Sequence, residues 1–226
     1  MWIFITGFER SGTTLLRRLL RQHKDIVEVF HENAFLSKEN YINEIKSVLE
    51  HDPYLCNWGE KIPYYSLKAT KGDKPIKEYV NEWVRASNED YRIIHILRNP
   101  IDVAISGKRT FGKDLKRTLI NHDKSVYDLM KFLEDKKSMN VKYEELVLNT
   151  DLILKNIFKF CGLSYDENEI RLISNSKRDK LRYFDGVEKS RAFAYKNDEL
   201  YKEILDIKEV NVFETAKKTG YDLEGL

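Results

Sequence analysis

The sequence has few of the features that mark metal-binding, disulfide-bonded or membrane proteins. Cys56 and Cys161 are its only two cysteines, and neither belongs to a CxxC pair, so neither a zinc site nor a disulfide framework is indicated. No run of about 18 apolar residues occurs, and no basic flank precedes the apolar run at 2–5, so neither a membrane span nor a signal peptide is predicted. We therefore expect a cytoplasmic protein whose two cysteines are buried and reduced.

An excess of one charge is also missing. The 39 lysines and arginines nearly balance the 37 aspartates and glutamates, which leaves a net charge of +2 and no electrostatic footprint for nucleic acid. A local cationic cluster for a small anion is still compatible with this balance. The chain has no internal repeat, low-complexity tract or clear linker. With 226 residues, of which 42% are hydrophobic, it predicts a single domain over residues 1–226.

Apolar strands and amphipathic helices alternate along the chain, which predicts an α/β fold with a mostly parallel central sheet flanked by helices. The expected strands are 2–6, 26–30, 93–97 and 141–143. The expected helices are 13–23, 38–50, 76–88, 100–106, 115–133 and 151–161. The stretch 52–75 is interpreted as loop with some short structure, because proline and glycine are scattered through it.

Local signals fix several of these helix ends. Asn99 followed by Pro100 is typical of a helix start, Thr150 is a candidate cap, and Gly162 is expected to end the helix before it. In the first helix four leucines recur at helical spacing, and the arginines at 17, 18 and 21 are expected on the opposite, polar face.

The stretch "ITGFERSGTTLLRRLL", residues 5–20, carries the first functional signal. Gly7 and Gly12 bracket a turn between a strand and a helix, where backbone amides and the helix N-terminus point at an oxyanion. Nucleoside triphosphatases have a lysine in this loop, but here the position holds Thr13, and the nearest cation is Arg10. The loop therefore suits a group that is less charged than a triphosphate. A simple strand-to-helix turn capped by Ser11 or Thr13 is the alternative.

Two segments resemble one family. "RSGTTLLRRLL" is similar to the 5′-phosphosulfate loop of the sulfotransferases, which use 3′-phosphoadenosine 5′-phosphosulfate (PAPS), and its arginine resembles the tyrosylprotein and related bacterial branch. "IIHILRNPIDVAIS", residues 93–106, looks like the family's 3′-phosphate motif, which implies that Arg98 and Ser106 bind that phosphate. The physical interpretation agrees, because an arginine fork suits a phosphate. The resemblance implies a three-layer P-loop-type fold with a parallel sheet.

Three further segments extend the resemblance toward residue 221. "WGEKIP", residues 58–63, implies that Lys61 approaches the transferred sulfonate. "VKYEEL" implies that Tyr143 lies near the adenine, with packing against the sheet as the alternative. "EKSRAFAYKNDELYKEI" resembles the family's closing lid and makes Lys189 and Arg191 candidates for the 3′-phosphate, although the glycine-rich form of that lid is missing.

Sulfonate transfer needs a base for the acceptor's proton. The resemblance places a glutamate about twenty residues after the loop arginine, so Glu32 is the expected base and the adjacent His31 is held in reserve. A helix-start carboxylate without catalytic function is the alternative for Glu32. Lys61 and Arg10 are then expected to stabilise charge on the sulfonate.

The departing 5′-phosphate is assigned to the loop, whose candidate binding residues are Ser11, Gly12, Thr13 and Thr14. No metal-binding signature is found, and none is needed.

Two other functions stay open on the sequence. One is a P-loop kinase, which needs a loop lysine and a magnesium-binding aspartate. The other is a non-catalytic protein that binds PAPS or its product PAP (3′-phosphoadenosine 5′-phosphate). The acceptor is a hydroxyl or amine of a small molecule, carbohydrate or peptide, and its specificity is expected in loops at 33–75 and 107–125. Five aromatic residues could line an apolar acceptor pocket: Phe35, Tyr41, Tyr64, Tyr65 and Phe111.

Overall fold

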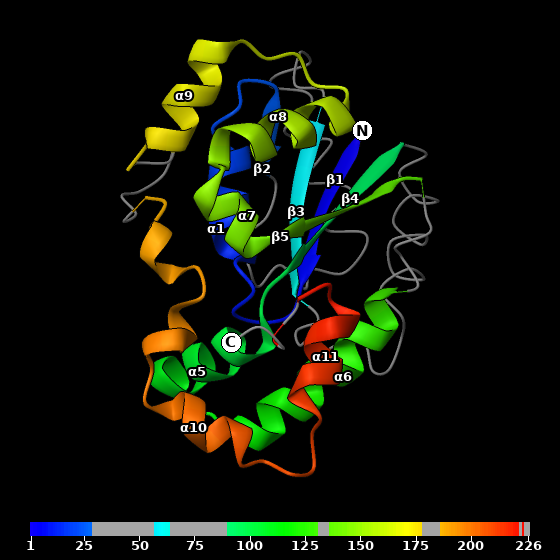
Figure 1. Ribbon diagram of the computed structural model, residues 1–226. Helices are drawn as coiled ribbons and strands as arrows, with labels where there is room; N and C mark the ends of the chain where they lie inside the picture. Colours follow the sequence, from blue (N-terminus) through cyan, green and yellow to red (C-terminus); the bar gives the residue numbers. More distant parts are fainter. Residues whose placement is uncertain (29–56, 64–89, 131–135, 178–185, 222, 224–226) are drawn as a thin grey trace.

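The protein is built around one parallel sheet, seen in the computed structural model of Figure 1. The structure describes residues 1–28, 57–63, 90–130, 136–177, 186–221 and 223. For residues 27–28, 57–63 and 126–130 only the backbone is described. The predicted helices at 38–50 and 76–88 lie outside the described residues.

In the described part of the chain five strands form the sheet, and every neighbouring pair is parallel. They are β1 (Trp2–Gly7), β2 (Ile26–Glu28), β3 (Asn57–Pro63), β4 (Tyr91–Leu97) and β5 (Ser138–Lys142). Their spatial order is β2-β3-β1-β4-β5, so the chain leaves β1 toward one edge and later returns to β1's other side with β4. The loops that follow β1 and β4 therefore meet at the carboxyl ends of two neighbouring strands, where open α/β sheets bind ligands.

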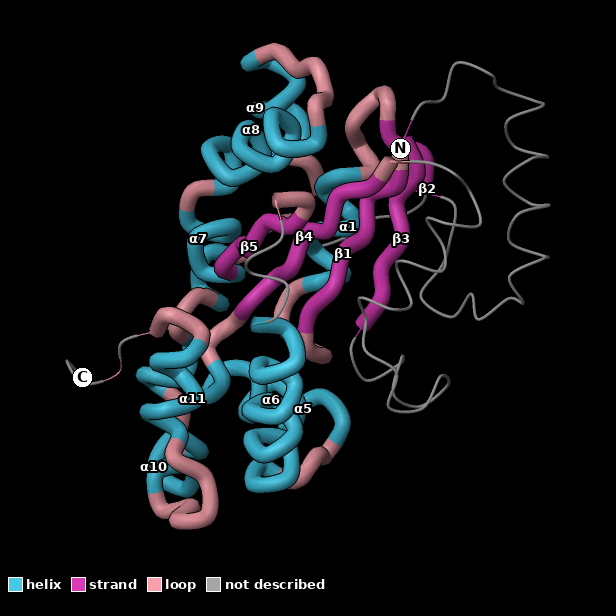
Figure 2. Tube along the Cα trace, turned by 90° about the vertical axis from the view of Figure 1, so that its right-hand side faces the viewer, coloured by secondary structure: helices cyan, strands magenta, loops and turns pink. Residues whose placement is uncertain are grey.

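Helices α1 (Thr13–Leu20), α7 (Tyr143–Leu148) and α8 (Thr150–Cys161) cover one face of the sheet, with α9 (Glu167–Asn175) beyond them (Figure 2). Their apolar side chains share one buried cluster with Ile3 and Ile5 of β1. On the other face of β1, Trp2 and Phe4 are also buried, with their ring centroids 6.0 Å apart. The prediction of an α/β fold with a central parallel sheet flanked by helices is confirmed.

A second group of helices lies beyond the carboxyl ends of the strands (Figure 1). It comprises α5 (Pro100–Phe111), α6 (Leu115–Met130), α10 (Leu200–Leu205) and α11 (Val212–Lys218), preceded by the short 3-10 turns η1 (Lys189–Arg191) and η2 (Ala194–Asn197). These elements have their own buried cluster, which includes Ile101, Leu119 and Ile204.

Helix ends follow the predicted signals in most places. The Asn99 side chain accepts a hydrogen bond from the Ile101 amide at 2.9 Å, and Pro100 begins α5. Gly162 ends α8 in the left-handed conformation at φ 68°. Thr150 does not cap α8: it is the first residue of the helix, and its hydroxyl donates to the Leu146 carbonyl at 2.8 Å.

Three expectations about local structure were wrong or incomplete. The 52–75 stretch contains β3, a seven-residue strand between β1 and β2, whose Gly59 and Pro63 had favoured a loop. Strand β5 ends at Lys142, and Tyr143 begins α7, because Glu144 and Glu145 favour the positive end of a helix.

The expected polar face of α1 is the third correction. Arg17 and Arg21 are 4% and 3% exposed, so both lie among packed residues instead of in solvent. Cys161 is buried, as expected, and burial raises the pKa of its thiol to about 12. Cys56 lies outside the described residues.

Candidate functional site

The loop between β1 and α1 is shaped by close backbone approaches. A side chain at Gly7 would place its Cβ 2.6 Å from the Ile96 carbonyl oxygen, so only glycine lets the ends of β1 and β4 pair this closely. Gly12 has φ 97°, and a Cβ there would lie 2.3 Å from Cδ2 of Tyr143. Arg10 also has a positive φ of 70°, which is uncommon outside glycine and points to a functional constraint on this loop.

The loop's amide groups are only partly available to a ligand. The Ser11 amide donates to the Phe8 carbonyl at 3.1 Å, which closes the turn. The amides of Gly12 and Thr13 donate to no residue in the described part of the chain, as the first N–H groups of a helix commonly do. An oxyanion placed before α1 would therefore meet Gly12 and Thr13 rather than the Ser11 amide. The Ser11 hydroxyl is buried and makes no hydrogen bond to a described residue.

Arg98 follows β4 directly and is held beside this loop. Its guanidinium donates to the Arg10 carbonyl at 3.1 Å and to the Arg191 carbonyl at 3.1 Å. It also lies 4.3 Å from the centroid of the Tyr143 ring, and the residue is 8% exposed. The Arg98 Nε is buried and makes no hydrogen bond to a described residue.

Helix α5 brings Ser106 to the same place. Asn99 caps α5 and Pro100 begins it, which sets where the helix starts. Ser106 follows about two turns later, on the side of the helix that faces the β1 loop. Arg10 Nε donates to Ser106 Oγ at 3.0 Å, and Arg10 also donates to Thr110 Oγ1 at 3.1 Å. Two residues that are 96 positions apart, one from each motif, are thus in direct contact.

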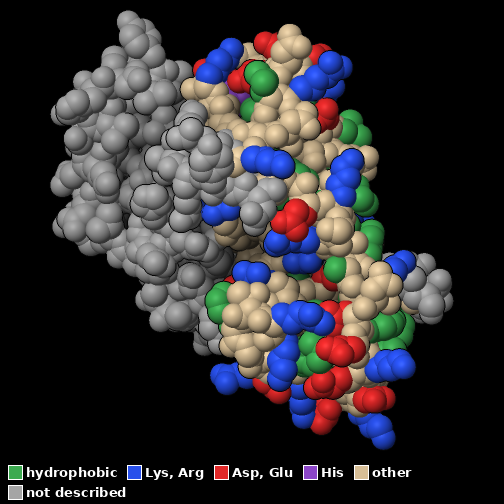
Figure 3. All heavy atoms as spheres, turned by 90° about the vertical axis from the view of Figure 1, so that its left-hand side faces the viewer, with side chains coloured by type: hydrophobic (Ala, Val, Ile, Leu, Met, Phe, Trp, Pro, Cys, Tyr) green, Lys and Arg blue, Asp and Glu red, His purple; other side chains and the backbone are tan. Residues whose placement is uncertain are grey.

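Three arginines gather at this point. Burial lowers the pKa of Arg10, the charge of Arg98 lowers it further, Glu9 opposes this, and Arg191 adds a smaller decrease. Arg191 is partly balanced by Glu188, which accepts from it at 2.6 and 2.8 Å. Figure 3 shows Lys and Arg side chains gathered midway along the molecule, between its two helical groups. The site is therefore arranged for an anion, because unlike charge relieves this repulsion.

The other predicted site residues have different outcomes. Tyr143 is 5% exposed and packs on both Arg98 and Gly12, so its contacts are those of the packing alternative, and a role near adenine stays a prediction. Arg191 reaches Arg98 through its carbonyl, whereas Lys189 is exposed and no described contact joins it to the loop. Lys61 lies on β3 opposite Ile5 of β1, and only its backbone is described. Glu32 and His31 lie outside the described residues.

A buried polar layer behind the arginines was missed by sequence reasoning. Glu144 accepts hydrogen bonds from the Asn99 amide at 3.1 Å and from the Tyr221 hydroxyl. Asp102 accepts from the Tyr195 amide at 2.9 Å, and burial raises the pKa of this carboxyl to about 6. The layer joins the turn between β4 and α5 to α7, η2 and the segment after α11, and Asn99, which follows Arg98 in the chain, is one of its members.

Two histidines continue this layer toward α6. His95 of β4 is 1% exposed, and its Nδ1 lies 3.1 Å from Asn140 Oδ1. His122 of α6 is 2% exposed, and its ring packs edge-on against Phe8 with centroids 5.1 Å apart. Burial lowers the pKa of each imidazole to about 4. Both rings are therefore neutral at pH 7 and serve packing beside the β1 loop.

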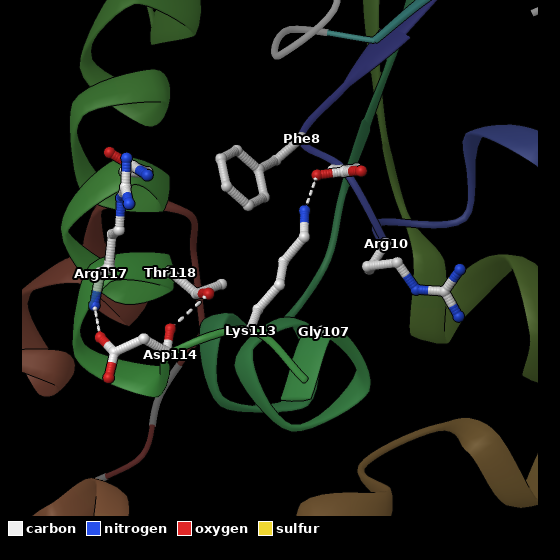
Figure 4. Close-up of a pocket in the computed structure, with 9 residues that line it drawn as sticks. Phe8, Arg10, Gly107, Lys113, Asp114, Arg117 and Thr118 are labelled. Carbon is white, nitrogen blue, oxygen red and sulfur yellow. Dashed lines mark hydrogen bonds and ion pairs between the residues drawn. The ribbon is translucent and has the colours of Figure 1, made fainter. Parts of the chain in front are cut away.

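A cavity opens on the α6 side of the β1 loop (Figure 4). Its volume is about 290 Å³. It is lined by Phe8, Glu9, Arg10, Gly107, Lys113, Asp114, Arg117, Thr118 and Asn121. Six of these residues belong to the 107–125 stretch in which acceptor specificity is expected.

Comparison with known proteins decides the family. The sequence profile of the sulfotransferase family matches residues 3–51 and 82–167, which contain the β1 loop, Arg98 and Ser106. The chain belongs to the sulfotransferase family. The matched residues include both motifs that meet at this edge of the sheet.

Solved sulfotransferase structures share the fold over nearly the whole chain. The sulfotransferase domain from the curacin biosynthetic pathway is 18% identical, with a TM-score of 0.66 and 98% of each chain covered. The sulfotransferase domain of the Synechococcus PCC 7002 olefin synthase is 17% identical, with a TM-score of 0.61, over 98% of this chain and 94% of that one. Mouse sulfotransferase SULT7A1, complexed with PAP, is 17% identical, with a TM-score of 0.56, over 97% and 87%.

A curated relative is much longer than this chain. An uncharacterized protein of Aquifex aeolicus (strain VF5) is 23% identical over 83% of the chain, and the chain spans only 29% of that protein's length. Within the described residues, no group of three or more His, Cys, Asp or Glu side chains is arranged to hold a metal ion. None of the described helices is both long enough and apolar enough to cross a membrane.

Proposed function

We propose that the chain transfers the sulfonate of PAPS to a hydroxyl or amine acceptor by in-line displacement without a metal ion. The observation that carries this proposal is the contact between the two motifs. Arg10 of the β1 loop donates a hydrogen bond to the Ser106 hydroxyl of α5, and Arg98 donates one to the Arg10 carbonyl. One cationic site thus adjoins a loop that has Thr13 where triphosphatases have lysine.

The donor's two phosphates have separate partners in this arrangement. Arg98 and Ser106 are assigned to the 3′-phosphate, because the Arg98 Nε has no hydrogen-bond partner among the described residues and both side chains lie beside Arg10. The amides of Gly12 and Thr13 at the start of α1 are assigned to the 5′-phosphate. The PAP bound in the mouse relative of the same fold supports a donor of this class.

The reaction itself is a single displacement. The acceptor oxygen or nitrogen forms a bond to sulfur while the bond from sulfur to the 5′-phosphate oxygen breaks. Glu32 takes the acceptor's proton, with His31 as the reserve, and Lys61 with Arg10 stabilises charge that passes to the bridging oxygen. PAP leaves with the electron pair of the broken bond. The sulfonate carries less charge than a phosphoryl group, so fixed cations suffice.

A kinase is less well supported by the same residues. Phosphoryl transfer from ATP needs a loop lysine and a carboxylate for magnesium. Thr13 occupies the lysine position, and the residue after β4 is Arg98 instead of an acid. A non-catalytic PAP-binding protein is distinguished from the enzyme by the transfer assay alone.

The direct test uses labelled PAPS and a panel of hydroxyl and amine acceptors, with and without EDTA. We expect label transfer that is insensitive to EDTA and that falls at least about 100-fold in Glu32→Ala and in Lys61→Ala. The exposed residues Lys24 and Glu199 supply charge-matched controls, and Lys24→Ala and Glu199→Ala are expected to keep full activity. Magnesium-dependent transfer from ATP would contradict the proposal. PAP binding without transfer to any acceptor would favour the binding protein.

A further inference from the structure

The cavity beside the β1 loop adjoins the donor site through a shared residue. Arg10 lines the cavity and also donates to Ser106 at the proposed 3′-phosphate position. Its opposite wall is the first turn of α6 (Figure 4). A hydroxyl held in this cavity therefore lies next to the loop that would carry the sulfonate. This inference rests on the proposed function and concerns what the acceptor looks like.

The two carboxylates of the cavity are already neutralised by the protein. Glu9 forms an ion pair with Lys113, which is the dashed contact of Lys113 in Figure 4, and each side chain is 33% exposed. Asp114 caps α6: its carboxylate accepts the Arg117 amide at 2.7 Å. The charge at a helix N-terminus compensates such a carboxylate. Neither acid is left to neutralise a further cation.

The cations that face the cavity are not all paired. Lys113 and Arg117 line it, whereas the Arg10 guanidinium points away from it and donates to Ser106 and Thr110 (Figure 4). The Arg117 guanidinium makes no ion pair or hydrogen bond with a side chain in the described part of the chain. Its neighbours on the same basic segment are paired outside the cavity, since Arg109 lies 2.9 Å from Asp198 and Lys116 lies 2.6 Å from Glu209. The cavity thus keeps a positive charge at Arg117 that no acid of the cavity neutralises. Lys113 is a second cation, and an anionic ligand that binds it more strongly than Glu9 does can replace Glu9 as its partner.

We propose that this cavity is the acceptor site and that the acceptor carries an anionic group, a phosphate, sulfate or carboxylate, bound by Arg117 and Lys113. Glu9 then acts as the internal competitor for Lys113. A neutral acceptor leaves the Arg117 charge without a partner. Selectivity for anionic acceptors is thereby a property of Glu9, Lys113 and Arg117, and not of the donor loop.

The experiment measures binding with the donor site filled. Matched acceptors, phenol against 4-hydroxybenzoate and glucose against glucose 6-phosphate, are titrated by calorimetry into protein saturated with PAP, which keeps the added anions out of the Arg98 site. We expect each anionic member to bind at least about tenfold more tightly than its neutral partner, as one charge-assisted contact provides. The advantage should shrink as the salt concentration is raised.

Two variants test the direction of the expected effect, and a third is a control. Arg117→Gln should reduce the anionic preference about tenfold, and Glu9→Gln should increase it, because Lys113 is released. Lys116→Gln removes a neighbouring cation outside the cavity and should leave the preference unchanged. Circular dichroism and PAP affinity report whether each variant is folded.

The inference is overturned if neutral and anionic members bind equally, if neither binds, or if Arg117→Gln keeps the preference. Failure of wild-type protein to bind PAP would contradict the proposed function instead, so the two outcomes are read separately.

Discussion

Replacing Arg98 by glutamine tests the binding of the donor's 3′-phosphate separately from the binding of its 5′-phosphate. The wild-type guanidinium donates to two backbone carbonyls at 3.1 Å each, and its buried Nε has no hydrogen-bond partner among the described residues. A hydrogen bond to a charged group contributes about 1.5–3 kcal/mol, which corresponds to roughly 10–150-fold in affinity. Arg98→Gln should therefore weaken PAP binding within this range. It should weaken binding of adenosine 5′-monophosphate, which lacks the 3′-phosphate, much less.

Calorimetric titration of both nucleotides into both proteins measures this difference directly. The ratio of the two affinities removes any general effect of the substitution on the fold, because both ligands are bound by the same protein. Arg92 supplies a matched control on the same strand: it lies at the start of β4 and pairs with Asp90 at 2.8 Å. Arg92→Gln should leave both affinities unchanged. An equal loss for PAP and for the monophosphate in Arg98→Gln would refute the assignment of Arg98 to the 3′-phosphate.

Two further predictions concern stability. Gly12→Ala should lower the unfolding free energy by about 1 kcal/mol more than Gly112→Ala in urea titrations, since both positions have positive φ but only Gly12 has a ring at 2.3 Å; equal losses would contradict the packing argument. The second prediction is pH-dependent. The pKa of Asp102 is raised to about 6, so this group stabilises the fold below pH 4, and the stabilisation is lost as the pH rises to 6. The pKa values of His95 and His122 are lowered to about 4, so these groups stabilise the fold above pH 6.5, and that stabilisation is lost as the pH falls to 4. The contribution of the two histidines is larger than that of the one carboxyl, so the unfolding free energy of the wild-type protein, measured by urea titration, should fall from pH 6.5 to pH 4. The fall should be steeper in Asp102→Asn and shallower in His122→Gln. Identical slopes in the three proteins would show that these groups do not titrate as described.

Sequence patterns predicted the elements that carry the motifs because their signals are local. The two glycines of the β1 loop, the Asn99 cap and the Gly162 stop each act within a few residues, and the structure contains all of them. The contact between Arg10 and Ser106 was not visible in either motif by itself. It follows from the pairing of β1 with β4, which brings the loops after these two strands together.

Other features depend on neighbours that no local pattern reveals. Strand β3 contains a glycine and ends in a proline, and it is a strand because β1 and β2 pair with both of its edges. Arg17 and Arg21 follow a polar helical pattern, yet packing buries them. The pairing of Glu9 with Lys113 joins residues 104 positions apart, so the charge balance of the cavity emerges only from the fold.

The most direct test of the whole account is a crystal structure of the protein with PAP bound. The account predicts the 3′-phosphate within hydrogen-bonding distance of Arg98 and Ser106, and the 5′-phosphate at the amides of Gly12 and Thr13. It also predicts that the cavity lined by Arg117 stays free of the nucleotide. A nucleotide bound in the cavity, or with its two phosphates exchanged, would contradict the account.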